Sequence, residues 1–214
     1  MSQQNTEDIG KEILKPTIDL SIDYAEIVLD EFWEEGILKE VPVIKTLISI
    51  VKTGLAIRER FFVKRFAVFL RELHTSGLNQ EKFNSFKIKF ENDSKFREGV
   101  VEKLLLLVDI SDSTNKSKII AHLFSVYIEG KYDWDRFLAL AICANNLQEY
   151  AYDFLQKMSQ RKPHGFAAGI NLIDNEGEAL VMACGIGRRF GTSFTITGLG
   201  QDLYQYGISK ISIN

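Results

Sequence analysis

Histidine and cysteine often serve as metal ligands or nucleophiles, and this chain of 214 residues has three of the first and two of the second. His74, His122 and His164 lie far apart, and none has a Cys, His, Asp or Glu at metal-ligand spacing. The sequence contains no H-E-x-x-H, C-x-x-C or G-x-S-x-G motif. We therefore expect no metal site, no cofactor and no catalytic residue, so that the protein is not an enzyme.

The two cysteines have the surroundings of core residues. Cys143 and Cys184 each lie in an apolar run, where a free thiol behaves as a small hydrophobic side chain. A nucleophilic cysteine would need a nearby base and positive charge, which the sequence does not display. Two widely separated cysteines make neither a disulfide framework nor a metal knuckle, so we expect a reducing compartment.

The stretch 185–191 combines glycines with arginines, as many phosphate-binding loops do. In such a loop the glycines follow a strand and precede a helix, so that the amides of the helix meet the phosphate. Here the stretch follows a predicted helix and precedes a predicted strand, and it lacks the Gly-Lys-Ser/Thr ending. A helix end followed by a turn is the favoured interpretation.

Two charged stripes follow helical spacing near the start of the chain. The acidic stripe consists of Asp19, Asp23, Glu26, Asp30 and Glu34. The basic stripe consists of Lys45, Lys52, Arg60, Lys64 and Arg71. Both stripes can face water, or they can face each other across a helical hairpin. A third interpretation leaves the basic stripe, with Arg58 and Arg65 nearby, to bind an acidic protein, nucleic acid or anionic lipid.

The composition of the chain excludes several classes of protein. Hydrophobic residues make up 45% of the chain, which excludes wholesale disorder, and 26 basic against 29 acidic residues give no global basic excess for nucleic acid. The most apolar window, 41–57, carries Lys45 and Lys52, so we expect no membrane-spanning helix. The N-terminus lacks a basic region followed by an apolar one, and we expect a cytoplasmic protein.

Glycine usage divides the chain. Nine of the 15 glycines follow residue 164, and helix interiors disfavour glycine. We expect a mainly α protein: a flexible N-terminus (1–15), a multi-helix bundle (16–158), and a small α+β module (165–214). Apolar periodicity and capping residues predict helices over 17–35, 43–74, 79–92, 95–109, 116–130 and 134–158. In the module they predict a helix over 175–184, strands over 188–190 and 193–196, and a final helix.

The strand-to-helix junction of the module has a recognisable pattern. Phe194 and Ile196 point to one side of a strand, Thr197 is placed to cap the next helix, and Gly200 follows three residues later. This pattern, continued by Leu203, is similar to the wing-to-helix junction of winged helix-turn-helix domains. The resemblance implies a winged-helix-like module.

In the winged-helix family, the helix before the wing enters the DNA major groove. Here that helix would be 175–184, which carries Glu176 and Glu178 and no Lys or Arg. Phosphate repels these carboxylates, and only Arg188 and Arg189 at the base of the wing are suitably charged. DNA binding is therefore not favoured.

The helical region carries a second resemblance. The stretch 42–65, which includes Ile-Arg-Glu-Arg-Phe-Phe at 57–62, resembles uncharacterised bacterial helical proteins encoded near phage-defence or mobile-element genes. The resemblance implies a bacterial phage-defence context and no particular activity.

Three hypotheses of different classes follow. The leading one is a non-enzymatic protein that acts through protein–protein contacts and self-associates into a homo-oligomer. Exposed aromatics would anchor such contacts, and Tyr150, Tyr152, Tyr204 and Tyr206 are candidates, with core packing as the alternative for each. The second is DNA binding through Arg188, Arg189 and the basic stripe. The third, less favoured, is a peripheral membrane effector that uses the amphipathic helix 42–73.

Overall fold

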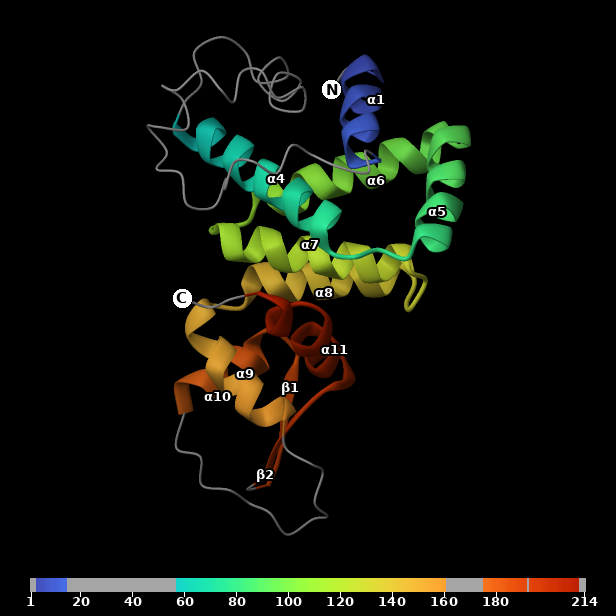
Figure 1. Ribbon diagram of the computed structural model, residues 1–214. Coiled ribbons are helices and arrows are strands. Elements are labelled where there is room, and N and C mark those ends of the chain that lie inside the picture. Colours follow the sequence, from blue (N-terminus) through green and yellow to red (C-terminus); the bar gives the residue numbers. More distant parts are fainter. Residues whose placement is uncertain (1–2, 15–56, 161–174, 192, 212–214) are drawn as a thin grey trace.

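The computed structural model describes residues 3–14, 57–160, 175–191 and 193–211. The first part of the described chain is entirely helical (Figure 1). Its helices are α1 (Gln3–Ile13), α4 (Ile57–Thr75), α5 (Gln80–Asn92), α6 (Ser94–Asp109), α7 (Thr114–Ile128) and α8 (Trp134–Asn146). The predicted helix 17–35 and the acidic stripe lie outside the described residues.

Side-chain caps fix where most of these helices begin. The cap oxygen accepts hydrogen bonds from first-turn amides that have no partner inside the helix. The capping residues are Asn79 for α5, Asp93 for α6, Ser113 for α7 and Asp133 for α8. The predicted helices 79–92, 95–109 and 116–130 are confirmed to within about two residues at each end, and for helix 134–158 the start is confirmed.

Helix α7 lies at the centre of the molecule and contacts α4, α5, α6 and α8. The Phe124 ring, fully buried on α7, lies 6.3 Å from Phe69 of α4, 5.8 Å from Phe86 of α5 and 5.4 Å from Phe137 of α8. Such aromatic pairs contribute about 0.5–1.5 kcal/mol each beyond the area that they bury. One ring therefore ties four helices together.

The second part of the chain begins after α8 and adds a small sheet. Its elements are η2 (Glu149–Ala151), α9 (Tyr152–Ser159), α10 (Asn175–Ala183), β1 (Gly187–Phe190), β2 (Ser193–Ile196), α11 (Gly198–Tyr206) and η3 (Ile208–Lys210). The strands pair antiparallel, with Arg189 opposite Phe194 and Phe190 opposite Ser193. Gly191, at φ +57°, supplies the positive dihedral of the turn. The mainly helical architecture with a small C-terminal hairpin is confirmed.

Helix α11 joins this second part to the helices above it. The Arg136 guanidinium of α8 donates to Asp202 of α11 from Nε at 3.0 Å and from Nη2 at 2.6 Å. Gly207, just after α11, lies so close to α7 that a Cβ there would stand 2.8 Å from Ile119. The strands extend away from α7 and α8 toward the opposite end of the molecule (Figure 1).

Two sequence expectations differ from the structure. Residues 1–15 were expected to be flexible, but residues 3–13 form α1, whose Ile9 and Ile13 are fully buried and which packs on α6. The expected single helix 134–158 is broken, because Leu147 is extended at ψ 126° and the Asn145 carbonyl accepts from Lys116 Nζ at 2.7 Å.

The break changes the boundary between the two parts. Helix α9 lies within the expected bundle range 16–158, yet it packs on α10, β2 and α11. The C-terminal part therefore begins at about η2 rather than at residue 165. Within the described segments, no helix is both long and apolar enough to cross a bilayer.

Two glycine substitutions should change stability in opposite directions. A Cβ on Gly200 would lie 2.3 Å from the Ile186 carbonyl oxygen, so α11 would have to move away from the start of the hairpin. We expect Gly200→Ala to destabilise the protein by about 1–3 kcal/mol in chemical denaturation.

Gly99 is the matched control, since it lies exposed on α6 with nothing near its missing Cβ. We expect Gly99→Ala to stabilise by about 0.5–1 kcal/mol. Equal effects of the two substitutions would contradict the close approach at Gly200.

Candidate interaction surface

The described part of the basic stripe lies on α4. Arg60, Lys64 and Arg71 are half-buried, and each already has an interaction partner within the chain. Burial lowers the pKa of Lys64. Lys45 and Lys52 lie outside the described residues. This part of α4 is therefore not an open cationic face, and the structure does not bring its charges together at a site.

Arg65, which the sequence places beside the stripe, closes the end of another helix. Its guanidinium is buried and donates from Nε to the Val108 carbonyl at 3.2 Å and from Nη2 to the Asp109 carbonyl at 3.1 Å. Carbonyls in the last turn of a helix lack partners within the helix and carry partial negative charge. Arg65 therefore serves to hold α4 against the C-terminus of α6.

The hairpin has an inward and an outward face, because residues that pair across two strands share a side. Gly187, Arg189, Phe194 and Ile196 form the inward face: Phe194 lies against Phe154 of α9 at 5.4 Å. We define the hairpin face as the four outward residues, Arg188, Phe190, Ser193 and Thr195. Arg188, Phe190 and Thr195 of this face are exposed, and so is Arg189 of the other face.

On the inward face, Arg189 is held by Glu178 of α10. Its Nε donates to Glu178 Oε1 at 2.6 Å and its Nη2 to Oε2 at 2.5 Å. This two-pronged hydrogen bond raises the pKa of Arg189. Because Glu178 is buried, the pair fixes α10 against β1. Arg189, whose side chain is 45% exposed, thus already has its guanidinium paired with a carboxylate of the chain.

On the hairpin face, Arg188 and Phe190 form a cation–π pair. The Arg188 guanidinium lies 4.8 Å from the centre of the Phe190 ring, and 61% of Phe190 is exposed. Aromatic and arginine side chains dominate the binding energy of protein interfaces. The hairpin face thus exposes an aromatic ring next to a guanidinium.

Comparison with models of known protein families, with curated proteins and with solved structures finds no match to this chain. The function must therefore be inferred from the chain's own geometry.

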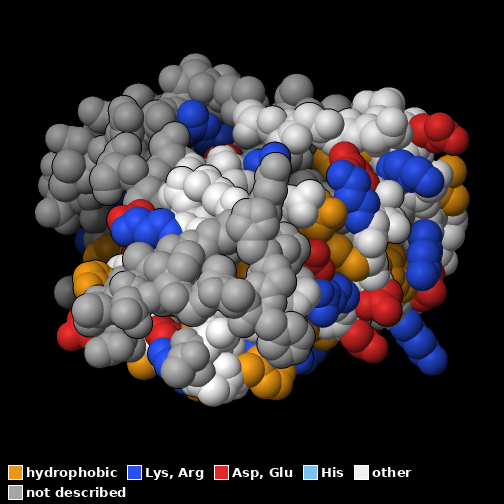
Figure 2. Space-filling view, turned by 90° about the horizontal axis from the view of Figure 1, so that it is seen from below, with side chains coloured by type: hydrophobic (Ala, Val, Ile, Leu, Met, Phe, Trp, Pro, Cys, Tyr) orange, Lys and Arg blue, Asp and Glu red, His pale blue; other side chains and the backbone are white. Residues whose placement is uncertain are grey.

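The face at the hairpin end carries no single-sign charge field over the part that is not grey (Figure 2). Positive and negative side chains are interspersed on its right-hand side, and apolar side chains form small separate groups. A nucleic-acid footprint is instead a basic patch or stripe. The visible part of this face does not show such a patch (Figure 2).

Of the tyrosines suggested as anchors, Tyr150 is exposed (64%), Tyr152 is buried (1%), and Tyr204 and Tyr206 are half-buried. Phe190 was missed as an anchor. A signal for it exists in the sequence, since Phe190 precedes the turn glycine and alternates with Arg188, which places both on one face of a strand.

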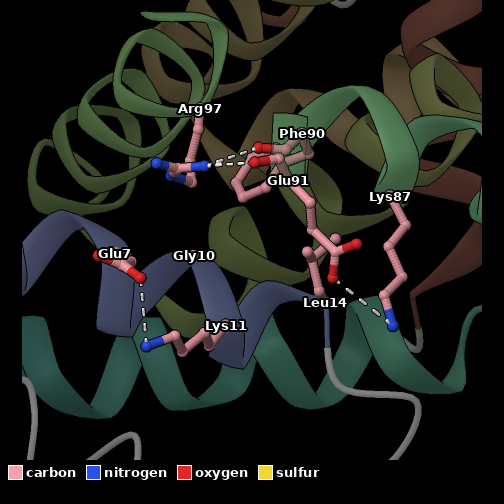
Figure 3. A pocket seen from close by; sticks show the side chains of 8 residues that line it. All are labelled: Glu7, Gly10, Lys11, Leu14, Lys87, Phe90, Glu91 and Arg97. Atoms are coloured by element: carbon pink, nitrogen blue, oxygen red, sulfur yellow. Dashed lines mark hydrogen bonds and ion pairs between the residues drawn. The ribbon is translucent and has the colours of Figure 1, made fainter. Parts of the chain in front are cut away.

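A cavity of about 460 Å³ lies between α1, α5 and α6 (Figure 3). It is lined by Glu7, Gly10, Lys11, Leu14, Lys87, Phe90, Glu91 and Arg97. Its charges are paired internally: Lys11 Nζ lies 3.4 Å from Glu7, and Lys87 Nζ lies 3.8 Å from Glu91. Arg97 donates to two carbonyls near the end of α5. The cavity thus offers polar groups that the protein already uses.

Of the histidines chosen for possible chemistry, His74 lies on α4 and His122 on α7, and His164 lies outside the described residues. Among the described residues, no group of three or more His, Cys, Asp or Glu is placed to hold a metal ion. Burial raises the pKa of both Cys143, to about 11, and Cys184, which disfavours the reactive thiolate. His122 Nε2 lies 2.7 Å from Glu72 and joins α7 to α4.

The two arginines of β1 should respond differently to substitution. Arg189→Gln leaves the buried Glu178 carboxylate without its cation, so we expect a melting temperature lower by several degrees. Arg188→Gln removes only a surface contact and should leave the melting temperature within about one degree of wild type. Thermal unfolding followed by circular dichroism measures both, and equal shifts would contradict the structural role of Arg189.

Proposed function

We propose that this chain is a non-enzymatic interaction protein that self-associates through the hairpin face. The observation that carries the proposal is Phe190, exposed at the end of β1 and covered only in part by Arg188. Both residue types are enriched at the centres of interfaces.

The hairpin face is suited to a second copy of itself. In a two-fold symmetric dimer the same patch occurs on both subunits, so it must be self-complementary. A patch that contains a guanidinium and an aromatic ring meets this condition, because the Arg188 guanidinium of one copy can stack on the Phe190 ring of the other. Ser193 and Thr195 add hydroxyl donors and acceptors beside them.

We further propose that α10, the hairpin and α11 form a winged-helix-like module used for protein contact. The order helix–hairpin–helix fits this proposal, as does the Thr197 side chain, which accepts from the Gly200 amide at 3.2 Å and caps α11. The first turn of α10 carries Glu176 and Glu178, which disfavour phosphate. A cytoplasmic location belongs to the same proposal, since free thiols persist in reducing compartments.

Truncation of Phe190 should weaken self-association. We expect wild type to form dimers in light scattering coupled to size-exclusion chromatography, and Phe190→Ala to raise the dimer dissociation constant roughly 30-fold, the effect of losing an interface anchor. The matched control is Ile88→Ala, because Ile88 is equally exposed (62%) but lies on α5, far from the hairpin in Figure 1. The control should dimerise as wild type does.

Two outcomes would contradict this proposal. One is a wild-type protein that stays monomeric at every concentration. The other is an equal loss of association in the Phe190 and Ile88 variants, which would place the contact elsewhere.

DNA binding, the alternative function, has its own readout. A mobility shift with duplex DNA at low salt, weakening steeply as salt rises and reduced by Arg188→Gln, would favour nucleic acid over a protein partner. From the internal pairing of Arg189 and the acidic first turn of α10 we expect no such shift.

A further inference from the structure

The two cysteines, 41 residues apart in the sequence, meet in the fold. The Cys143 Sγ, on α8, donates to the Cys184 carbonyl oxygen at 3.2 Å. Cys184 lies just beyond the last residue of α10. The two cysteines are therefore in direct contact, with the Cys143 sulfur against the backbone of Cys184.

The surroundings of the pair favour a covalent link. Cys184 is half-exposed and accessible from solvent, whereas Cys143 is buried (7%). The turn after Cys184 contains Gly185 at φ +70°, where a residue without Cβ gives the backbone room to adjust. Burial, followed by the nearby Cys184, raises the pKa of Cys143 to about 11.

We propose that Cys143 and Cys184 form a reversible disulfide that links α8 to the end of α10. The oxidant is a low-molecular-weight disulfide such as oxidised glutathione. The Cys184 thiolate attacks one sulfur of this disulfide and releases one glutathione thiolate, which leaves a mixed disulfide on Cys184. The Cys143 thiolate then attacks the Cys184 sulfur and releases the second glutathione thiolate. The two protons lost by the cysteine thiols pass through solvent to the two released glutathione thiolates, so each protein disulfide formed reduces one oxidised glutathione to two thiols.

The link would act on the part of the chain that carries the hairpin. Helix α10 is bound to β1 through the Glu178–Arg189 pair, so a bond from α8 to the end of α10 also restrains the hairpin. Closing the loop between the two cysteines restricts the unfolded chain and should raise stability. In a reducing compartment such a bond forms only under oxidising conditions, as redox-sensing disulfides do.

The full-length wild-type protein tests the proposal. It is incubated with excess oxidised glutathione at about pH 8.5, because thiolates react and both thiols have raised pKa values. Samples are quenched with acid, then unfolded in urea at about pH 8 with iodoacetamide so that every remaining thiol is alkylated, and weighed by mass spectrometry. We expect a monomer lighter by two hydrogen atoms, resistant to iodoacetamide, with the peptides of Cys143 and Cys184 joined, and restored by dithiothreitol.

Single variants separate the two steps. Cys143→Ser should stop at the mixed disulfide and gain one glutathione on Cys184. Cys184→Ser should remain largely unmodified over the same time, because its remaining thiol is buried.

The proposal is overturned if wild type keeps two alkylatable thiols, if it accumulates the stable glutathione adduct, or if it forms disulfide-linked dimers instead.

Discussion

The burial of helix α7 is the constraint on which the rest of the structure depends. Most of its residues are buried, and they include the charged Lys116, whose side chain is only 3% exposed. An ammonium group removed from water must be fully paired. Lys116 Nζ binds Asp112 at 2.8 Å and the Asn145 carbonyl at 2.7 Å, so the end of α8 is fixed by the charge on α7. The chain turns at this point into η2 and α9.

This turn explains how one core positions two different parts of the molecule. The aromatic side chains around Phe124 hold α4, α5 and α8 against α7, while Gly207 lets the C-terminal elements approach the same helix through Ile119. Arg136 and Asp202 add a specific ion pair between α8 and α11. The hairpin is consequently anchored at its helical side and exposed at the other, which is the arrangement that a contact surface requires.

Local sequence signals were sufficient to predict most helices, because caps such as Asn79 and Ser113 bind amides only two or three residues away. Contacts between distant residues were beyond such signals. Tyr150 and Tyr152 have the same residue type and neighbouring positions, yet one is exposed and the other buried, since burial depends on what packs from elsewhere. Helix α1 was missed because its polar sequence contributes only a short apolar face, which α6 covers.

Contacts between distant residues also decide which charges of the candidate site are already paired within the chain. Sequence spacing treats Arg65, Arg188 and Arg189 as equivalent cations. In the fold, Arg65 binds carbonyls of α6 and Arg189 binds Glu178, so both serve the structure. Arg188 lies against the exposed ring of Phe190. A guanidinium that stacks on a ring keeps its N–H groups, which lie at its edge, free to donate hydrogen bonds. Strand alternation and one buried carboxylate thus distinguish Arg188, which lies against Phe190, from Arg189, which binds Glu178.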